Sequence, residues 1–320
     1  MARTVRPTDY GTPDVLEVAD TPVPTPSADG VVVKVRAAGV NPIDWKLYSG
    51  QFHAVADKHK NATGLAESLP KLGLECAGVV TAVGADVTGI EVGAEVIVYP
   101  VAGAYADYVT APATSLIPKP ADLDWPEAGS LMLAGLTAAH TLHAAGVGRG
   151  DTVLVHGAAG GVGLLVTQLA AASGARVIGT AAERNHDLLR EFGATPVRYG
   201  DGLLERVRTA APDGITAAID CVGTDEALDT SLALVPDPQR IASIAGTPRR
   251  AAAGIKVLGN GPGQDAGAEF RDSVRADLAA RAGKGELRVL IDTTYPLTEA
   301  AAAHRAGIAG HAPGKLVLLP

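Results

Sequence analysis

The sequence predicts an α/β protein of two domains, a small β-rich domain and a doubly wound domain built on a parallel sheet. The early part of the chain consists of short β-branched runs broken by glycine and proline, whereas strand-like and helix-like segments alternate from Asp151 onward. Strand-like segments return near the end of the chain. We therefore expect residues 1–121 and 285–320 to form the β-rich domain and residues 122–284 to form the parallel-sheet domain.

Composition narrows the class of protein. A chain of 320 residues with 47% hydrophobic and 19% charged residues is long and apolar enough for two folded cores. Its net charge of −8 argues against nucleic-acid binding, which needs a clustered basic surface. The sequence shows neither a signal-peptide pattern nor an apolar run long enough to cross a bilayer. We therefore expect a cytoplasmic protein with no nucleic-acid or membrane partner.

The β-rich domain is predicted from runs of valine and isoleucine between turns. Residues 21–26 are studded with proline and cannot lie inside a sheet. Where the parallel-sheet domain begins, a helix is expected from Trp125 to about Ala145, with Pro126 at a tolerated early position. The strands expected in the β-rich domain span residues 30–35, 77–84, 91–98, 287–292 and 315–319.

The parallel-sheet domain is predicted from regular alternation, because a strand, a helix and a second parallel strand form one βαβ unit. The expected strands span residues 152–156, 175–180, 217–222 and 240–245. The expected helices span residues 162–173, 226–234 and 269–282, with a further helix through residues 188–192. Residues 255–258 are expected near an exposed edge of the sheet, where two copies could pair as a homodimer.

A glycine-rich segment follows the strand that ends at His156 and precedes an amphipathic helix. Its three spaced glycines follow the pattern GxxGxxG, and such a turn leaves backbone N–H groups bare to bind a diphosphate at the start of a helix. A flexible turn is the alternative, but the strand and helix on either side favour a dinucleotide site. The residues predicted to hold the diphosphate are Gly157, Ala158, Ala159, Gly160, Gly161, Val162 and Gly163.

The end of the next strand indicates which dinucleotide is bound. NAD-binding units place a carboxylate there for the ribose 2′-hydroxyl, whereas this chain has Thr180, and Arg184 could pair with a 2′-phosphate. Glu183 complicates this interpretation because its carboxylate could turn inward. Alternatively, Glu183 and Arg184 form a solvated helix start. We predict NADPH rather than NADH.

Several motifs spread along the chain resemble those of zinc-free medium-chain dehydrogenases/reductases, specifically the quinone oxidoreductase branch. They comprise residues 37–44, 73–80, 135–138, 155–163, 220–223 and 314–318. The resemblance implies a GroES-like β-rich domain and a Rossmann domain. Zinc-using relatives carry their ligands where this chain has Asn41, Leu74 and Ala134, so we expect no zinc.

The two nearby histidines in the predicted helix do not change this expectation. His140 and His143 are spaced to share a metal, but no third donor is in view. Packing or surface positions are the favoured interpretation. Cys76 and Cys221 likewise form no metal or disulfide pattern.

The resemblance also assigns roles along the coenzyme. It implies that Asn41 lies beside the nicotinamide ribose and a water, that Thr137 contacts the nicotinamide end, and that Tyr199 stacks near the adenosine. Each has a plainer interpretation: a turn residue before Pro42, a helix threonine bonded to its own backbone, and a half-buried strand aromatic. The strand-end residues expected along the coenzyme are Val222, Gly223, Ala245 and Gly246.

Candidate proton donors follow Asn41. Asp44, Lys46 and Tyr48 alternate in the sequence, so we expect them on one face of an extended segment, with Tyr48 or Lys46 protonating an enolate. All three are also ordinary solvated polar residues by composition. Residues 51–69 are expected to form a loop that sets substrate choice.

The predicted activity is hydride transfer from NADPH to a quinone or an α,β-unsaturated carbonyl, since without a metal the negative charge must spread into an enolate or hydroquinone. One alternative is an enoyl-thioester reductase or a tailoring enzyme of secondary metabolism. Another is an NADPH-binding structural or regulatory protein with little catalysis.

Overall fold

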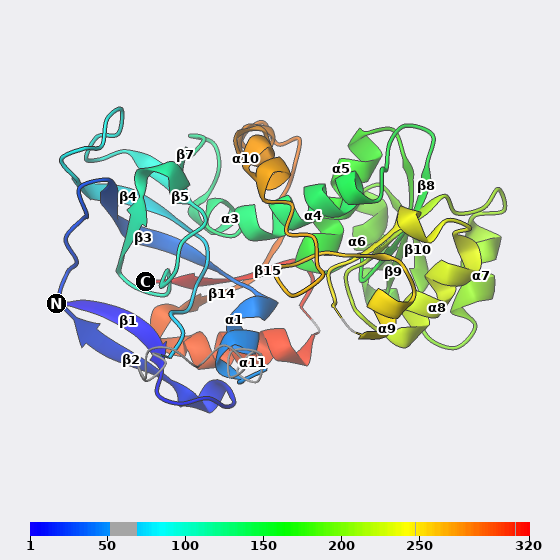
Figure 1. The fold of residues 1–320 in the computed structure, drawn as a ribbon, viewed down its shortest axis with the longest axis horizontal. Coiled ribbons are helices and arrows are strands. Elements are labelled where there is room, and N and C mark those ends of the chain that lie inside the picture. The colour runs from blue at the N-terminus through cyan, green and yellow to red at the C-terminus, as the bar shows by residue number, and fades with distance from the viewer. Residues whose placement is uncertain (52–68, 247, 311) are drawn as a thin grey trace. The chain divides into compact units, whose positions relative to one another are not determined.

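The computed structural model describes residues 1–51, 69–246, 248–310 and 312–320, and it divides into two compact units (Figure 1). Unit 1 comprises residues 1–133 and 291–320, and unit 2 comprises residues 134–290. These boundaries fall later in the chain than those expected from the sequence. A physical reason is that Gly129 packs in unit 1: its carbonyl accepts the Gly39 N–H at 2.8 Å, and a side chain there would meet the carbonyl oxygen of Ala37.

Unit 1 is built on a mixed sheet with a separate β-hairpin. Its strands are β1 (Ala2–Pro7), β2 (Leu16–Thr21), β3 (Gly30–Val40), β4 (Cys76–Val83), β5 (Glu95–Val98), β6 (Tyr108–Pro112), β7 (Leu116–Pro118), β14 (Ile291–Pro296) and β15 (Lys315–Leu319). β1 and β2 form the hairpin. Among the described residues the main sheet has the order β14-β15-β3-β4-β5-β7, and β6 also pairs with β3.

The described residues of unit 1 include the helices α1 (Pro42–Tyr48), α3 (Trp125–Ala128) and α11 (Ala300–Ala309). The prediction that residues after Asn41 are extended is wrong. Proline at the first helical position starts α1, and the Asp44 carboxylate accepts the Asn41 N–H at 2.9 Å, which caps the helix. α11, which the sequence analysis did not predict, packs against α1 and β15.

Unit 2 has a parallel sheet with the order β10-β9-β8-β11-β12-β13 among the described residues. Its strands are β8 (Thr152–His156), β9 (Arg176–Ala181), β10 (Ala194–Arg198), β11 (Ala217–Asp220), β12 (Ile241–Ser243) and β13 (Lys256–Val257). Its helices are α4 (Met132–Ala144, which begins in unit 1), α5 (Gly161–Ala172), α6 (His186–Glu191), α7 (Leu203–Ala210), α8 (Asp225–Leu234), α9 (Pro248–Ala252) and α10 (Ala268–Gly283).

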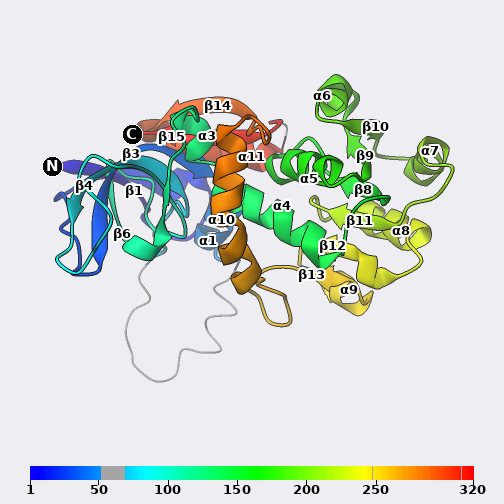
Figure 2. The same ribbon diagram turned by 90° about the horizontal axis from the view of Figure 1, so that it is seen from above.

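Helices cover both faces of this sheet, as the alternating pattern predicts. Leu154, Ile178 and Val197 on three neighbouring strands share a buried cluster with Leu203 of α7 and Leu228 of α8. α5 and α6 lie on the side of the sheet opposite to α8 (Figure 2). The prediction of an α/β fold with a β-rich domain and a domain built on a parallel sheet is confirmed.

Several expected elements have other bounds in the structure; the strand expected over residues 91–98, for example, begins only at Glu95. The helix expected over residues 125–145 is split into α3 and α4 at Gly129–Leu131. The strand expected over residues 287–292 begins only at Ile291, because Arg288 is held by its backbone carbonyl and N–H to the side chain of Gln168 on α5. No helix among the described residues is long and apolar enough to cross a membrane.

Candidate functional site

The glycine-rich loop of unit 2 joins β8 to α5. Gly157 has a positive φ of 71°, a conformation that side chains rarely adopt, and the neighbouring Ala158 N–H donates to the carbonyl of Thr180 at 3.0 Å. A Cβ on Gly163 would collide with the carbonyl oxygen of Gly157, so the turn packs against the first turn of the helix. Glycine is therefore required at both positions for geometric reasons.

The first turn of α5 can receive an anion. Its N-cap, Gly160, offers no capping side chain, and the first N–H groups of a helix have no preceding helical carbonyl to bond. The helix dipole also favours negative charge at this end. A Cβ on Gly160 would meet only the Gly157 carbonyl oxygen, at 3.4 Å, so glycine is not needed there for packing. The loop therefore fits a diphosphate.

The end of β11 carries a second tight turn beside this loop. The Asp220 carboxylate accepts the N–H groups of Val222 and Gly223 at 3.0 and 2.8 Å, and Gly223 has a positive φ of 85°. Arg250 holds this carboxylate through a fully buried ion pair of 2.8 Å. Sequence analysis missed the roles of Asp220 and Arg250, although a carboxylate at the end of a parallel strand was a usable signal.

The end of β12, next to β11, carries a further tight turn. The N–H of Ala245 donates to Ser243 Oγ at 3.1 Å, and a Cβ on Gly246 would collide with the side chain of Gln264. Because β9, β8, β11 and β12 are neighbours and parallel, their carboxyl ends lie side by side along the same end of the sheet. The structure thus brings together the predicted residues Gly157–Gly163, Thr180, Val222, Gly223, Ala245 and Gly246.

Thr180 lies beneath the glycine-rich loop rather than on the surface. It is buried, and its Oγ1 accepts the N–H of Gly157 at 3.3 Å. His156 lies next to it, and burial lowers the pKa of this imidazole to about 4, so the ring is neutral at neutral pH. Thr180 therefore supports the loop and leaves no carboxylate at the strand end.

Other residues predicted near the adenosine are exposed. Tyr199 follows β10 and is 53% exposed, and Arg184 is an exposed residue of the short 3-10 turn Glu183–Asn185. Sequence analysis missed Arg198, the last residue of β10, whose Nε lies 3.7 Å from Glu183 Oε1. Its proximity comes from strand pairing, which has no local sequence signal.

Thr137 and the two histidines lie along α4. Thr137 is buried and its Oγ1 accepts a hydrogen bond of 3.0 Å from Arg271 of α10. His140 is buried and bonded to Asp265, and burial lowers its pKa. His143 stacks on Phe270 with ring centres 4.0 Å apart. Packing accounts for both histidines.

Unit 1 contains a buried polar cluster around Asn41. The Lys315 ammonium donates to Asn41 Oδ1, to the carbonyl of Val40 at 3.1 Å and to Glu75 Oε1 at 3.4 Å. The Asn41 amide nitrogen donates to Glu75 Oε1 at 2.9 Å, and Glu75 Oε2 accepts the Leu133 N–H at 2.8 Å. These contacts hold the Asn41 amide in one orientation. Sequence analysis missed Lys315 and Glu75.

This cluster does not fit a zinc ion. The positions at which the resemblance implies zinc ligands hold Asn41, Leu74 and Ala134, none of which offers a zinc ligand, and a buried ammonium lies beside the Glu75 carboxylate. Within the described part of the chain, no three His, Cys, Asp or Glu side chains gather as a metal site would need.

The candidate proton donors Asp44, Lys46 and Tyr48 all lie on α1, but they differ in burial. Tyr48 is buried in the core of unit 1, where its hydroxyl bonds His304 Nδ1 at 2.8 Å and burial raises its pKa above the usual range. Asp44 is also buried, which raises its pKa to about 6 although Tyr105 donates to it. Lys46 is only half-buried. The loop expected over residues 51–69 falls almost wholly outside the described residues.

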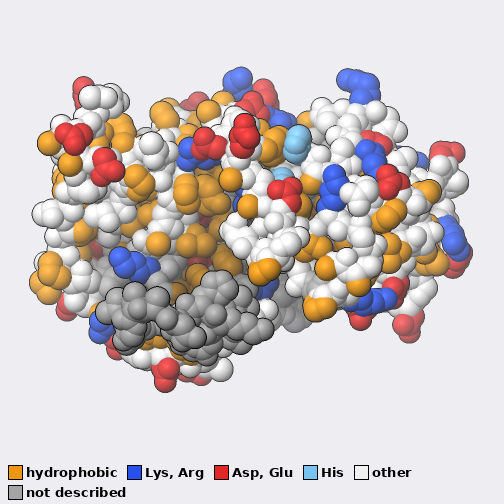
Figure 3. Space-filling view, viewed as in Figure 1, with side chains coloured by type: hydrophobic (Ala, Val, Ile, Leu, Met, Phe, Trp, Pro, Cys, Tyr) orange, Lys and Arg blue, Asp and Glu red, His pale blue; other side chains and the backbone are white. Residues whose placement is uncertain are grey.

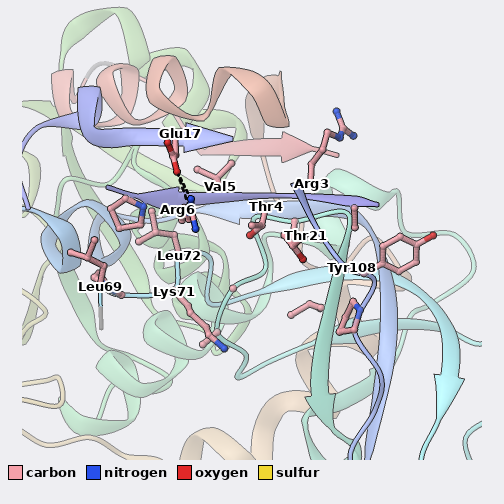
Figure 4. A pocket seen from close by; sticks show the side chains of 18 of the residues that line it. Arg3, Thr4, Val5, Arg6, Glu17, Thr21, Leu69, Lys71, Leu72 and Tyr108 are labelled. Carbon is pink, nitrogen blue, oxygen red and sulfur yellow. Dashed lines mark hydrogen bonds and ion pairs between the residues drawn. The ribbon is translucent and has the colours of Figure 1, made fainter. Parts of the chain in front are cut away.

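A separate pocket of about 630 Å³ lies in unit 1 beside the β1–β2 hairpin (Figure 4). Arg6 and Glu17 form an ion pair of 2.7 Å on its wall. None of the site residues predicted from the sequence lines it.

On the face seen in Figure 3, acidic and basic side chains are interspersed, without a large patch of one sign.

Two family models match successive parts of this chain. Residues 27–121 match the model of the alcohol dehydrogenase GroES-like domain, and residues 192–318 match a model described as zinc-binding dehydrogenase. Quinone oxidoreductase of Mus musculus is 30% identical, with 100% of this chain and 98% of that protein covered. The chain belongs to the medium-chain dehydrogenase/reductase superfamily.

Within this superfamily the chain falls in the quinone oxidoreductase branch, and it is an oxidoreductase enzyme. The Escherichia coli quinone oxidoreductase complexed with NADPH has a TM-score of 0.84 at 26% identity, with full coverage of both chains. The CurK enoyl reductase has a TM-score of 0.86 at 26% identity, with 99% of each chain covered.

Proposed function

We propose that this medium-chain reductase transfers a hydride from NADPH to a quinone or an α,β-unsaturated carbonyl, without zinc. The observation that carries the proposal is the glycine-rich cradle at the carboxyl edge of the unit 2 sheet, where Gly157 turns and α5 begins with uncapped N–H groups. The relatives named quinone oxidoreductase, one of them complexed with NADPH, support the coenzyme and the acceptor class.

The chain's own residues supply binding and orientation. The N–H groups at the start of α5 would hold the diphosphate, and the Asp220–Arg250 pair fixes the Val222–Gly223 turn at the carboxyl end of β11. When bound, NADPH supplies the hydride. In unit 1 the buried Lys315 ammonium supplies positive charge beside Glu75, and it orients Asn41.

We assign the proton-donor role to Lys46. Lys46 is half-buried on α1 and so keeps contact with solvent, whereas Tyr48 is enclosed in the core with its hydroxyl bonded to His304. Once the hydride has reached the β-carbon of an enone, the proton passes to the resulting enolate. For a quinone the proton passes to a reduced oxygen.

The test is the oxidation of NADPH by the purified enzyme with a panel of quinones and enals, in buffer treated with a metal chelator. The proposal is supported if NADPH oxidation persists in the chelator and elemental analysis finds much less than one metal ion per protein chain. Tight NADPH binding with no turnover on any acceptor favours the alternative of a binding protein with little catalysis. Turnover that returns only with zinc contradicts the metal-free part.

A second candidate, enoyl-thioester reduction, is favoured by the similarity to CurK enoyl reductase. The net charge of −8 offers little attraction to a phosphorylated carrier, which places this candidate second. The discriminating measurement is kcat/KM for a short enoyl thioester against the simple enone of the same carbon skeleton. A higher value for the thioester favours the second candidate.

We further infer a homodimer formed through the exposed edge of the unit 2 sheet. β13 (Lys256–Val257) is the edge strand of this sheet among the described residues, the position at which strands of two copies can pair across a two-fold axis, although the Val257 carbonyl already accepts the Asp265 N–H at 3.0 Å. Light scattering on the eluted protein measures the mass directly. A cytoplasmic location stays a prediction.

A further inference from the structure

The end of the unit 2 sheet carries an exposed ion pair between neighbouring strands. β10 pairs in parallel with β9, and the register sets Arg198 opposite Ala181, the residue after Thr180. The Arg198 Nε lies 3.7 Å from Glu183 Oε1, with 55% and 73% of the two side chains exposed. Arg198 therefore lies at the end of β10, beside the end of β9, and Glu183 lies two residues beyond the end of β9, the second strand of the coenzyme domain.

This position is where a dinucleotide fold meets the ribose of the adenosine. A carboxylate there accepts the 2′-hydroxyl of NADH, whereas an arginine there binds the 2′-phosphate of NADPH. Arginine suits phosphate because its planar fork can donate two parallel hydrogen bonds. The chain carries both groups at this edge, and in the described structure they neutralise each other.

The ion pair is weak enough to exchange partners. Its separation exceeds hydrogen-bond length, and exposed pairs of this kind contribute little because water screens them. A phosphate carries more charge than a carboxylate and offers three acceptor oxygens. A 2′-phosphate should therefore replace Glu183 as the partner of the Arg198 guanidinium.

We propose that Arg198 binds the 2′-phosphate of the coenzyme and that Glu183 is its exchangeable internal counter-ion. The inference rests on the proposed use of NADPH and assigns the residues that set the preference for it. Glu183 then has two opposite effects: it competes with the 2′-phosphate for Arg198, and it offers an acceptor to the 2′-hydroxyl of NADH. Coenzyme preference is the balance between them.

The experiment measures dissociation constants by calorimetry for four ligands, namely NADPH, NADH, 2′,5′-ADP and 5′-AMP. The two fragments report on the adenosine end alone. We expect Arg198→Gln to weaken NADPH and 2′,5′-ADP by roughly 10- to 100-fold while changing NADH and 5′-AMP little. We expect Glu183→Gln to tighten NADPH and weaken NADH.

The matched control is Arg208→Gln. Arg208 forms an exposed pair of 2.6 Å with Glu205 on α7, so this variant removes the same charge from the same unit without touching the sheet edge. It should leave all four constants unchanged. If Arg198→Gln weakens NADPH and NADH equally, or if Arg184→Gln alone abolishes the preference, the assignment is overturned. Failure of the wild-type enzyme to bind either coenzyme would instead contradict the proposed function.

Discussion

The ammonium of Lys315 lies 3.4 Å from the carboxylate of Glu75, and both side chains are buried in unit 1. Adjacent strands produce this contact: β15 pairs with β3, which ends next to Asn41, and β3 pairs with β4, which starts just after Glu75. A pair buried in this way is costly to break from one side, because the remaining charge has no partner.

Replacing the ammonium should therefore destabilise the protein strongly. We expect Lys315→Met to lower the free energy of unfolding by about 3–5 kcal/mol, as measured by urea denaturation. The double variant Glu75→Gln with Lys315→Met should regain part of this loss. As a control, Arg6→Gln breaks an exposed pair and should cost less than about 1 kcal/mol. A single Lys315 variant as stable as the Arg6 variant would contradict the buried pairing.

Two glycines of the loop should separate folding from coenzyme binding. Gly163→Ala forces a Cβ into the Gly157 carbonyl oxygen and should destabilise the fold by about 1–3 kcal/mol. Gly160→Ala meets only an ordinary contact, so stability should change little, but the added methyl group hinders approach of the diphosphate. We expect calorimetry to show NADPH binding weakened about 10-fold. Wild-type NADPH affinity in Gly160→Ala would count against this loop as the cradle.

Stability should depend on pH through His304. Its imidazole is enclosed by Trp45, Tyr48 and Tyr105, and burial lowers its pKa from 6.5 to about 4. Between these values the unfolded chain binds a proton and the folded protein does not, so the free energy of unfolding falls as pH drops through this window. His156 and Asp44 also titrate there.

Comparison with His304→Gln isolates this contribution, because His156 and Asp44 are present in both proteins. The stability advantage of the wild type over the variant should shrink as the pH is lowered from 7 to 4, measured by denaturation at each pH. A difference that stays constant with pH would show that the His304 imidazole titrates normally in the fold.

The two candidate proton donors on α1 should respond differently to substitution. Lys46→Met should lower kcat by about 10- to 100-fold while leaving NADPH affinity unchanged. Tyr48→Phe should retain kcat but lose about 1 kcal/mol of stability, because only its hydrogen bond to His304 is removed. Steady-state kinetics with a responsive quinone measures the difference. A large fall in kcat for Tyr48→Phe alone would reverse the assignment.

Much of unit 2 could be predicted from the sequence because its strands are short apolar runs between turn signals. β8 matches its predicted range, and α5, α8 and α10 begin within a residue of theirs. In a parallel sheet covered on both faces, local hydrophobicity and strand position are closely linked. The glycine-rich loop could be predicted as well, because its spaced glycines stand between a clear strand and a clear helix.

The elements and contacts that the sequence analysis missed depend on pairing between distant segments. Lys315 and Glu75 are 240 residues apart, and no local pattern links them. Arg198 meets Glu183 only through the parallel register of β10 and β9. α1 is different: Asn41 followed by Pro42 and Asp44 is a helix-start signal, and it was outweighed by the alternation of polar residues.

β15 is an interior strand, flanked by β14 and β3, although it is made of residues 315–319. A ribosome completes all of unit 2 before it delivers this strand. Until then the end of β3, residues 38–40, lacks its β15 partner, although residues 30–34 can already pair with β6, and the inserted second unit is already free to fold. The main sheet of unit 1 can therefore be completed only after unit 2 has been synthesised.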